Sequence, residues 1–151
     1  MKTLLIVYHT GGVKTEKMAA AVEHGARGEE SVNVIVKRCA DAGPEDVLAA
    51  DALILGTPEN FGYMSGMMKD FLERVFYACE GKVNGRPYAL FVGAGQDGSG
   101  AVSSVERIVT GLRLEKKSEP VIGLKDLTPE VLSKCEELGA AFAAGLALGV
   151  Y

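Results

Sequence analysis

Short apolar segments alternate with longer segments of helical period along almost the whole length of this 151-residue chain. Parallel strands cannot be joined by tight turns, so their connections usually contain a helix. The alternation therefore predicts an open parallel sheet of five strands, with helices on both of its faces. The expected strands are residues 4–8, 32–36, 52–55, 88–92 and 121–122.

The expected helices follow from apolar stripes and from start signals. Stripes at helical spacing cover residues 15–26 and 101–112, and a short helix with a proline in its first turn covers 44–50. Ser65 is the expected N-cap of a helix from residue 67, and Thr128-Pro129-Glu130 opens the last helix. These elements use nearly every residue, so we expect residues 1–151 to form a single domain.

Composition excludes several classes of protein. Apolar residues make up 48% of the chain and charged residues 24%, which is typical of a folded globular protein. The net charge of −4 includes no basic block, so nucleic acid is not an expected partner. The apolar stretch 138–151 is shorter than the ~20 residues of a membrane span. The three cysteines have no metal-ligand spacing, which favours a reduced, cytoplasmic setting without a metal site.

Three loops of unusual composition follow expected strands, where ligands bind in sheets of this kind. The first loop, residues 9–15, combines two glycines, Lys14 and the hydroxyls of Thr10 and Thr15 before a helix N-terminus. Such an N-terminus favours an anion, so the loop predicts a phosphate cradle. The alternative is a glycine turn capped by threonine.

The second loop, residues 56–66, holds three glycines, a proline and two aromatic residues. Its backbone can approach a flat ligand closely, and an aromatic ring can lie against that ligand. The alternative is a packed turn in which Phe61 and Tyr63 cover the core.

The third loop, residues 93–100, matches the G-x-G-x-x-G dinucleotide fingerprint at Gly93, Gly95 and Gly98. It follows the fourth strand, whereas that fingerprint belongs after the first strand of a dinucleotide domain. We therefore interpret it as a glycine-rich ligand loop that meets the polar edge of a heterocycle.

The three loops together resemble those of the flavodoxin-like flavoproteins, most closely the NAD(P)H-dependent quinone reductases of the tryptophan-repressor-binding-protein type. The most specific part is the run Gly56-Thr57-Pro58, Phe61-Gly62 and Met64-Ser65-Gly66. The resemblance covers essentially the whole chain. It implies a flavodoxin-like, doubly wound α/β fold with a five-stranded parallel sheet in the order 2-1-3-4-5.

The resemblance also implies an FMN site made from all three loops, with no catalytic residue and no metal. The first loop would hold the FMN phosphate, the second would border the isoalloxazine ring, and the third would contact the pyrimidine side of the ring. The implied FMN-binding residues are Thr10, Gly11, Gly12, Val13, Lys14 and Thr15; Pro58, Glu59, Asn60, Phe61 and Gly62; and Gly93, Ala94, Gly95, Gln96 and Asp97.

In such a reductase, NADH or NADPH delivers a hydride to FMN, and the electrons then pass to a quinone or a similar small acceptor. His9 and Tyr63 are the loop residues that could supply a proton. The family's phosphate loop carries threonine and glycine where this chain has Gly12 and Val13. The family also makes a homodimer or homotetramer plausible.

Two other functions share this fold. A flavodoxin-type electron carrier would bind FMN without NAD(P)H chemistry of its own, but such carriers are usually far more acidic than this chain, whose net charge is −4. A receiver-like signalling module would place acidic residues after the first strand, where Tyr8, His9 and Thr10 stand instead.

Overall fold

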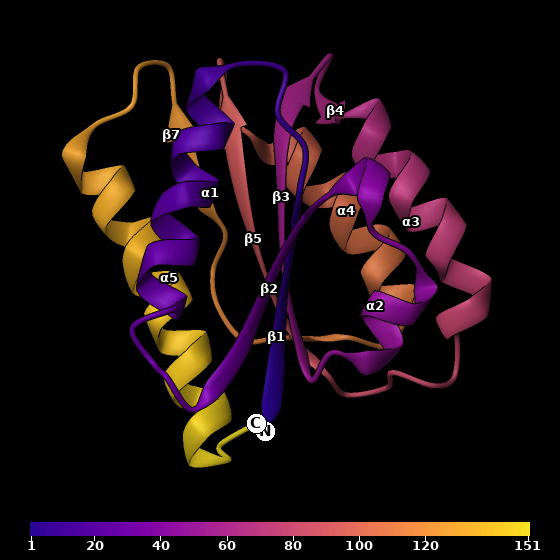
Figure 1. Ribbon diagram of the computed structural model, residues 1–151. Coiled ribbons are helices and arrows are strands. Elements are labelled where there is room, and N and C mark those ends of the chain that lie inside the picture. Colours follow the sequence, from indigo (N-terminus) through magenta and orange to yellow (C-terminus); the bar gives the residue numbers. More distant parts are fainter.

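One twisted sheet runs through the computed structural model, which describes residues 1–151 (Figure 1). Its strands are β1 (Lys2–Tyr8), β2 (Val32–Arg38), β3 (Ala52–Asn60), β4 (Tyr63–Met64), β5 (Pro87–Ala94), β6 (Glu115–Lys116) and β7 (Val121–Leu124). Its helices are α1 (Val13–Ala26), the 3-10 turn η1 (Cys39–Asp41), α2 (Pro44–Ala49), α3 (Gly66–Cys79), α4 (Ser99–Gly111) and α5 (Pro129–Leu148).

The main strands are parallel, with β2, β1, β3 and β5 in that order and β7 beside β5. Because β5 and β7 are the expected fourth and fifth strands, the predicted order 2-1-3-4-5 is confirmed. The short β6 also pairs with β5, near its start. Two successive short strands, β6 and β7, therefore fill the fifth position. The strand β2 lies at an edge of the sheet.

Helices cover both faces of the sheet, with α1 and α5 on one face and α2, α3 and α4 on the other (Figure 1). Side chains of one strand alternate between two cores. In β1, Leu5 and Val7 enter the core under α2, α3 and α4, while Leu4 and Ile6 enter the core under α1 and α5. None of the helices combines the length and apolarity that a membrane span requires.

The largest departure from the expected boundaries is in β3. The apolar run 52–55 predicted a strand that ends at Leu55, but β3 continues to Asn60 and pairs with β4 in a hairpin. Its partner β1 ends opposite Gly56, whereas pairing with β5 continues to Pro58. At Thr57 and Pro58 the side of β3 that faced β1 is therefore unpaired. Proline, which has no N–H, is tolerated in a strand at such a place.

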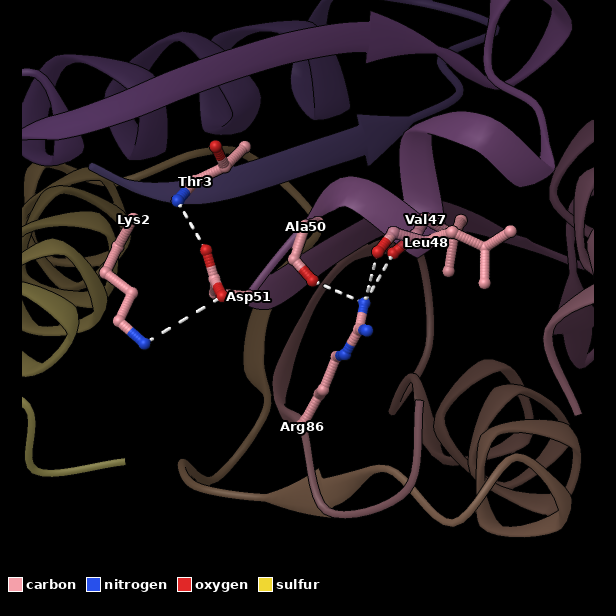
Figure 2. Close-up of polar contacts among 7 residues, drawn as sticks. All are labelled: Lys2, Thr3, Val47, Leu48, Ala50, Asp51 and Arg86. Atoms are coloured by element: carbon pink, nitrogen blue, oxygen red, sulfur yellow. Dashed lines mark hydrogen bonds and ion pairs between the residues drawn. The ribbon is translucent and has the colours of Figure 1, made fainter. Parts of the chain in front are cut away.

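At the amino edge of the sheet, two side chains form hydrogen bonds with backbone groups of adjacent elements (Figure 2). The Arg86 guanidinium donates to the carbonyl oxygens of Val47, Leu48 and Ala50, at 3.0, 2.8 and 2.6 Å. It thus supplies a donor to carbonyl groups at the C-terminus of α2, of which Val47 O also accepts from Ala50 N. Asp51 accepts from Thr3 N at 2.8 Å and joins β1 to the start of β3.

Candidate functional site

The three predicted ligand loops meet at the carboxyl edge of the sheet, at the ends of β1, β3 and β5. The β1–β3 ladder continues past the end of β1, where His9 N donates to the carbonyl oxygen of Gly56 at 3.0 Å. Lys14 Nζ donates to the carbonyl oxygen of Ala94 at 2.8 Å and joins the first loop to the third. The tertiary structure thus places all three loops around one region.

In the first loop, α1 begins at Val13, two residues earlier than expected, and its N-cap is Gly12. No side chain caps this N-terminus. The Thr10 hydroxyl bonds to the backbone of Gly12, and Thr15 is buried in contact with Gly93. Of the side chains expected to form a phosphate cradle, Thr10 and Lys14 have hydrogen-bond partners within the protein, and Thr15 is buried. The uncapped N-terminus of α1 faces solvent through the exposed Gly11, Gly12 and Val13.

The second loop is a β-hairpin rather than the irregular connection that its composition suggested. Glu59 pairs with Met64 and Asn60 pairs with Tyr63, which leaves a two-residue turn of Phe61 and Gly62. Both turn residues have positive φ, 55° and 68°. Two-residue hairpin turns of this type require positive φ at both positions, which glycine tolerates and phenylalanine normally avoids.

The Phe61 side chain is fully exposed, with 106% relative exposure, and Tyr63 is 44% exposed. The alternative that these rings cover the core is therefore wrong for Phe61. The polar Thr57 instead lies in the interior, where its hydroxyl accepts from Ser65 N at 3.0 Å and fixes the start of α3. An aromatic ring held in solvent by a turn of unfavourable conformation is available to a ligand.

In the third loop, polar side chains cap the N-terminus of α4. Asp97 Oδ1 accepts from Ser99 N at 3.0 Å and from Ser99 Oγ at 2.8 Å, and these bonds lower the pKa of Asp97. Glu59 Oε2, which comes from β3, accepts from Gly100 N and Ala101 N at 3.0 and 3.1 Å. Two predicted FMN-binding carboxylates thus serve this helix, while Gly95 and Gln96 stay exposed beside them.

A known protein family matches the middle of the chain. Residues 40–115 match the family described as NADPH-dependent FMN reductase, and this segment contains the hairpin and the third loop. The chain belongs to this family. The predicted resemblance to flavodoxin-like NAD(P)H-dependent FMN reductases is therefore confirmed.

Relatives of this family member include proteins named for two different activities. The chain is 37% identical over 112 residues, 74% of its length, to a flavodoxin from Aquifex aeolicus, and covers 60% of that protein. It is 32% identical over 113 residues to an NAD(P)H dehydrogenase (quinone) from Acidithiobacillus ferrooxidans, which is 61% of this chain and 56% of that protein. The chain thus spans rather more than half the length of these curated relatives.

Among solved structures, a flavodoxin from the domain Archaea superposes with a TM-score of 0.84 at 20% identity. The match covers 96% of this chain and 99% of that one. At this identity the likeness concerns the fold, and it confirms the predicted flavodoxin-like class.

The carboxyl edge of this FMN reductase family member fits the two chemically different ends of FMN. The uncapped N-terminus of α1 suits a phosphate, because its backbone N–H groups and its dipole favour an anion. A Cβ added to Gly11 or Gly12 would meet nothing within 4 Å, so there is room for a group there. The exposed Phe61 ring suits the flat isoalloxazine.

A groove of about 880 Å³ begins at the hairpin and runs between α3 and α4. Its lining includes Tyr63, Phe76, Tyr77 and Arg107. Sequence reasoning missed this groove because its residues come from three separate elements with no shared motif. An aromatic residue could have indicated it. Tyr77 lies outside the core-facing stripe of α3, and its side chain is 83% exposed.

The two residues considered as proton donors lie in different surroundings. Burial lowers the pKa of His9, and the nearby charge of Arg38 lowers it further, so both favour the neutral imidazole. Tyr63 is partly exposed at the hairpin. The three cysteines are buried, and burial raises the pKa of Cys39 to about 12 and of Cys135 to about 11. Thiols in this state are poor nucleophiles.

Proposed function

We propose that this chain binds FMN at the carboxyl edge of its sheet, takes a hydride from NADH or NADPH, and reduces a quinone or a similar small acceptor. The family match over residues 40–115 is the observation that carries this proposal, because it falls on the hairpin and the third loop. The relative named as an NAD(P)H dehydrogenase (quinone) supports the nature of the acceptor.

In this proposal, the first loop holds the FMN phosphate mainly through backbone N–H groups. Thr10, Lys14 and Thr15 shape the loop through bonds and contacts within the protein, and the N–H groups of the first turn of α1, from Val13 to Thr15, would face the phosphate. This accounts for the missing threonine of the family's loop, because backbone N–H groups of the helix replace the side-chain donor.

The isoalloxazine ring would lie between the hairpin and the third loop. Phe61 would contact its face, while Pro58, Asn60 and Gly62 would border it. Exposed Gly95 and Gln96 would meet its polar edge. Buried Gly93 and Ala94 would anchor the loop at the end of β5 and so determine how closely it approaches the ring. Bound FMN would supply the chemistry, since its ring accepts a hydride and gives up two electrons.

The groove between α3 and α4 is the candidate place for the second substrate. It opens at Gly62 and Tyr63, next to the proposed ring site, and its aromatic lining suits a flat molecule. Arg107, exposed in the same groove, offers a positive charge for an anionic group such as a nucleotide phosphate.

A flavodoxin-type electron carrier is the second candidate, and the Aquifex flavodoxin at 37% identity favours it. Both candidates need the same FMN site. They differ only in whether NADH or NADPH reduces the bound flavin.

The decisive experiment is to load the purified chain with FMN, remove oxygen, and add NADH or NADPH while recording the visible flavin absorbance. Bleaching, followed by recovery when a quinone is added, is the expected result. Bound FMN that bleaches only with a chemical reductant would favour the carrier. Failure to bind FMN at all would contradict both candidates.

Three further predictions concern the setting of the protein. We expect residues 1–151 to act as a single domain, in the cytoplasm, as a homodimer or homotetramer. Light scattering on the purified chain at several concentrations would measure the oligomeric state.

A further inference from the structure

Helix α4 takes part of its N-terminal cap from a distant strand. Its own N-cap residue, Gly98, has no side chain to cap the helix. Glu59, which lies 41 positions before Gly100, accepts from the N–H groups of Gly100 and Ala101 through a single oxygen, Oε2. A carboxylate at a helix N-terminus also interacts favourably with the helix dipole. The contact therefore joins β3 to α4 through charge-assisted hydrogen bonds.

Two further contacts hold the hairpin against the same helix. Met64 N, in β4, donates to Ser104 Oγ at 3.0 Å. The carbonyl group of Gly62 packs so closely on Gly100 that a Cβ at position 100 would overlap it. Glu59, Gly62 and Met64 surround the exposed Phe61 in the chain, so the turn is held on both sides while the ring itself touches solvent.

We propose that Glu59 is a positioning residue, which clamps the hairpin onto α4 and so fixes the place of the Phe61 ring. This differs from the role of direct FMN contact that the resemblance implied for Glu59, because Oε2 is already used by two N–H groups. The effect of the clamp on FMN binding rests on the proposed function. The clamp itself does not, since all its partners belong to the chain.

The backbone conformation of Phe61 explains why the turn needs such a clamp. A phenylalanine with a φ of 55° is in a region that its side chain disfavours, so the turn depends on contacts elsewhere to keep it there. Without Glu59, the turn residues gain alternative conformations. A ligand that needs the ring in one place then binds more weakly.

The first measurement uses the absence of tryptophan from this chain. A Phe61→Trp substitution makes a single tryptophan reporter at the turn, and the anisotropy of its fluorescence, excited selectively over the tyrosines, reports how freely the turn moves in the FMN-free protein. Adding Glu59→Ala should lower the anisotropy. Adding Glu59→Gln should leave it close to the parent value, because the amide oxygen still accepts from both N–H groups.

The second measurement is FMN affinity in proteins that keep Phe61. We expect Glu59→Ala to weaken binding about tenfold, and Glu59→Gln to stay within about threefold of the native chain. Gly100→Ala leaves Glu59 in place but disturbs the contact with Gly62, so it should weaken binding in the same direction as Glu59→Ala. It also provides a second route should Glu59→Ala fold poorly.

The matched control is Thr128→Ala, which removes the side-chain cap of α5 outside the three loops. It should lower stability without changing either readout. Unchanged anisotropy in Glu59→Ala, or equal losses in Thr128→Ala, would overturn the clamp. Equal losses in Glu59→Gln would assign the effect to charge and overturn it too. If the native chain fails to bind FMN, the proposed function fails, and the anisotropy still decides the clamp.

Discussion

The two edges of the parallel sheet treat the ends of their helices differently. At the amino edge, Arg86 binds three carbonyl groups at the C-terminus of α2, and Asp51 binds the N–H of Thr3 (Figure 2). At the carboxyl edge, α4 is capped by Asp97 and Glu59, but no side chain caps α1. One helix N-terminus at that edge therefore keeps its donors available.

The difference separates the parts of the chain that stabilise it from the parts available to a ligand. Backbone groups at helix ends need partners, and a protein gains stability when it supplies them from its own side chains. At the amino edge and at α4, side chains of the chain supply these partners. At α1 no side chain does, and at the hairpin the Phe61 ring is exposed to solvent. Substitutions at the two edges should therefore have separable effects on stability and on FMN affinity.

Arg86→Ala should produce the largest change in stability. It removes four hydrogen bonds from a charged donor, three of them to carbonyl groups at the end of α2, so we expect the free energy of unfolding to fall by about 3 kcal/mol. FMN affinity, measured below the unfolding transition, should not change. Urea unfolding measures the first quantity, and Lys134→Ala, which removes an exposed positive charge from α5, is the control. A large loss of FMN affinity in Arg86→Ala would show that the two edges are not independent.

Gly12→Asp should move stability and affinity in opposite directions. An aspartate at this N-cap would satisfy the open donors of α1 and raise the free energy of unfolding by about 0.5 kcal/mol. Gly12 has an extended backbone, with φ −169°, and open space around it, so the side chain fits. The same carboxylate would repel a phosphate, and FMN affinity should fall by about tenfold or more.

Gly12→Ala, which adds a Cβ without a cap or a charge, is the control for Gly12→Asp. It should keep most of the FMN affinity. If Gly12→Asp binds FMN as tightly as the native chain, the phosphate does not lie at the α1 N-terminus.

Phe61→Asn should also raise stability while it weakens FMN binding, but by smaller amounts than Gly12→Asp. Asparagine accepts positive φ more readily than phenylalanine, and Asn-Gly is a preferred pair in two-residue hairpin turns, so stability should rise by a few tenths of a kcal/mol. Loss of the ring should weaken FMN binding by about threefold to tenfold. Isothermal titration and thermal unfolding would measure the two effects. A loss of stability with unchanged affinity would contradict a ligand-facing role for Phe61.

His9 should give the smallest effect, visible only in the pH dependence of stability. Because its folded pKa lies below the unfolded value of about 6.5, the unfolded state binds more protons in that window, and stability falls as the pH falls through it. His9→Asn should reduce this slope. Urea unfolding at several pH values would measure it, and above about pH 7.5 the two stability curves should run parallel. An equal slope in the variant would assign the acid sensitivity to other groups.

Much of the fold could be predicted because it depends on local patterns. The short apolar runs at residues 4–8 and 88–92 indicated strands, and β1 and β5 occupy these positions. Thr128 and Ser65 were recognised as N-caps, and both accept the expected hydrogen bonds from Val131 N and Met68 N. In each case a few neighbouring residues carry the information, and burial on one or both faces reinforces it.

The hairpin was missed because the local sequence argues against it. Glycines and Pro58 predicted an irregular loop after Leu55, and phenylalanine is a poor choice for a turn with positive φ. Contacts from α4 stabilise the turn nevertheless, through Gly100 and Ser104. These residues lie about 40 positions further along the chain, and no local pattern links them to the hairpin.

By itself, the sequence determined the α/β class, the five main strands and the five helices, and the three segments that carry the candidate site, because hydrophobic period and turn residues act over short distances. Only the tertiary structure decided which groups in those segments remain available. Lys14 and Glu59 have the chemistry of ligand-binding residues, yet each bonds to backbone brought near by the packing of strands and helices. The uncapped N–H groups of α1 and the exposed ring of Phe61 remain, because no other part of the fold satisfies or covers them.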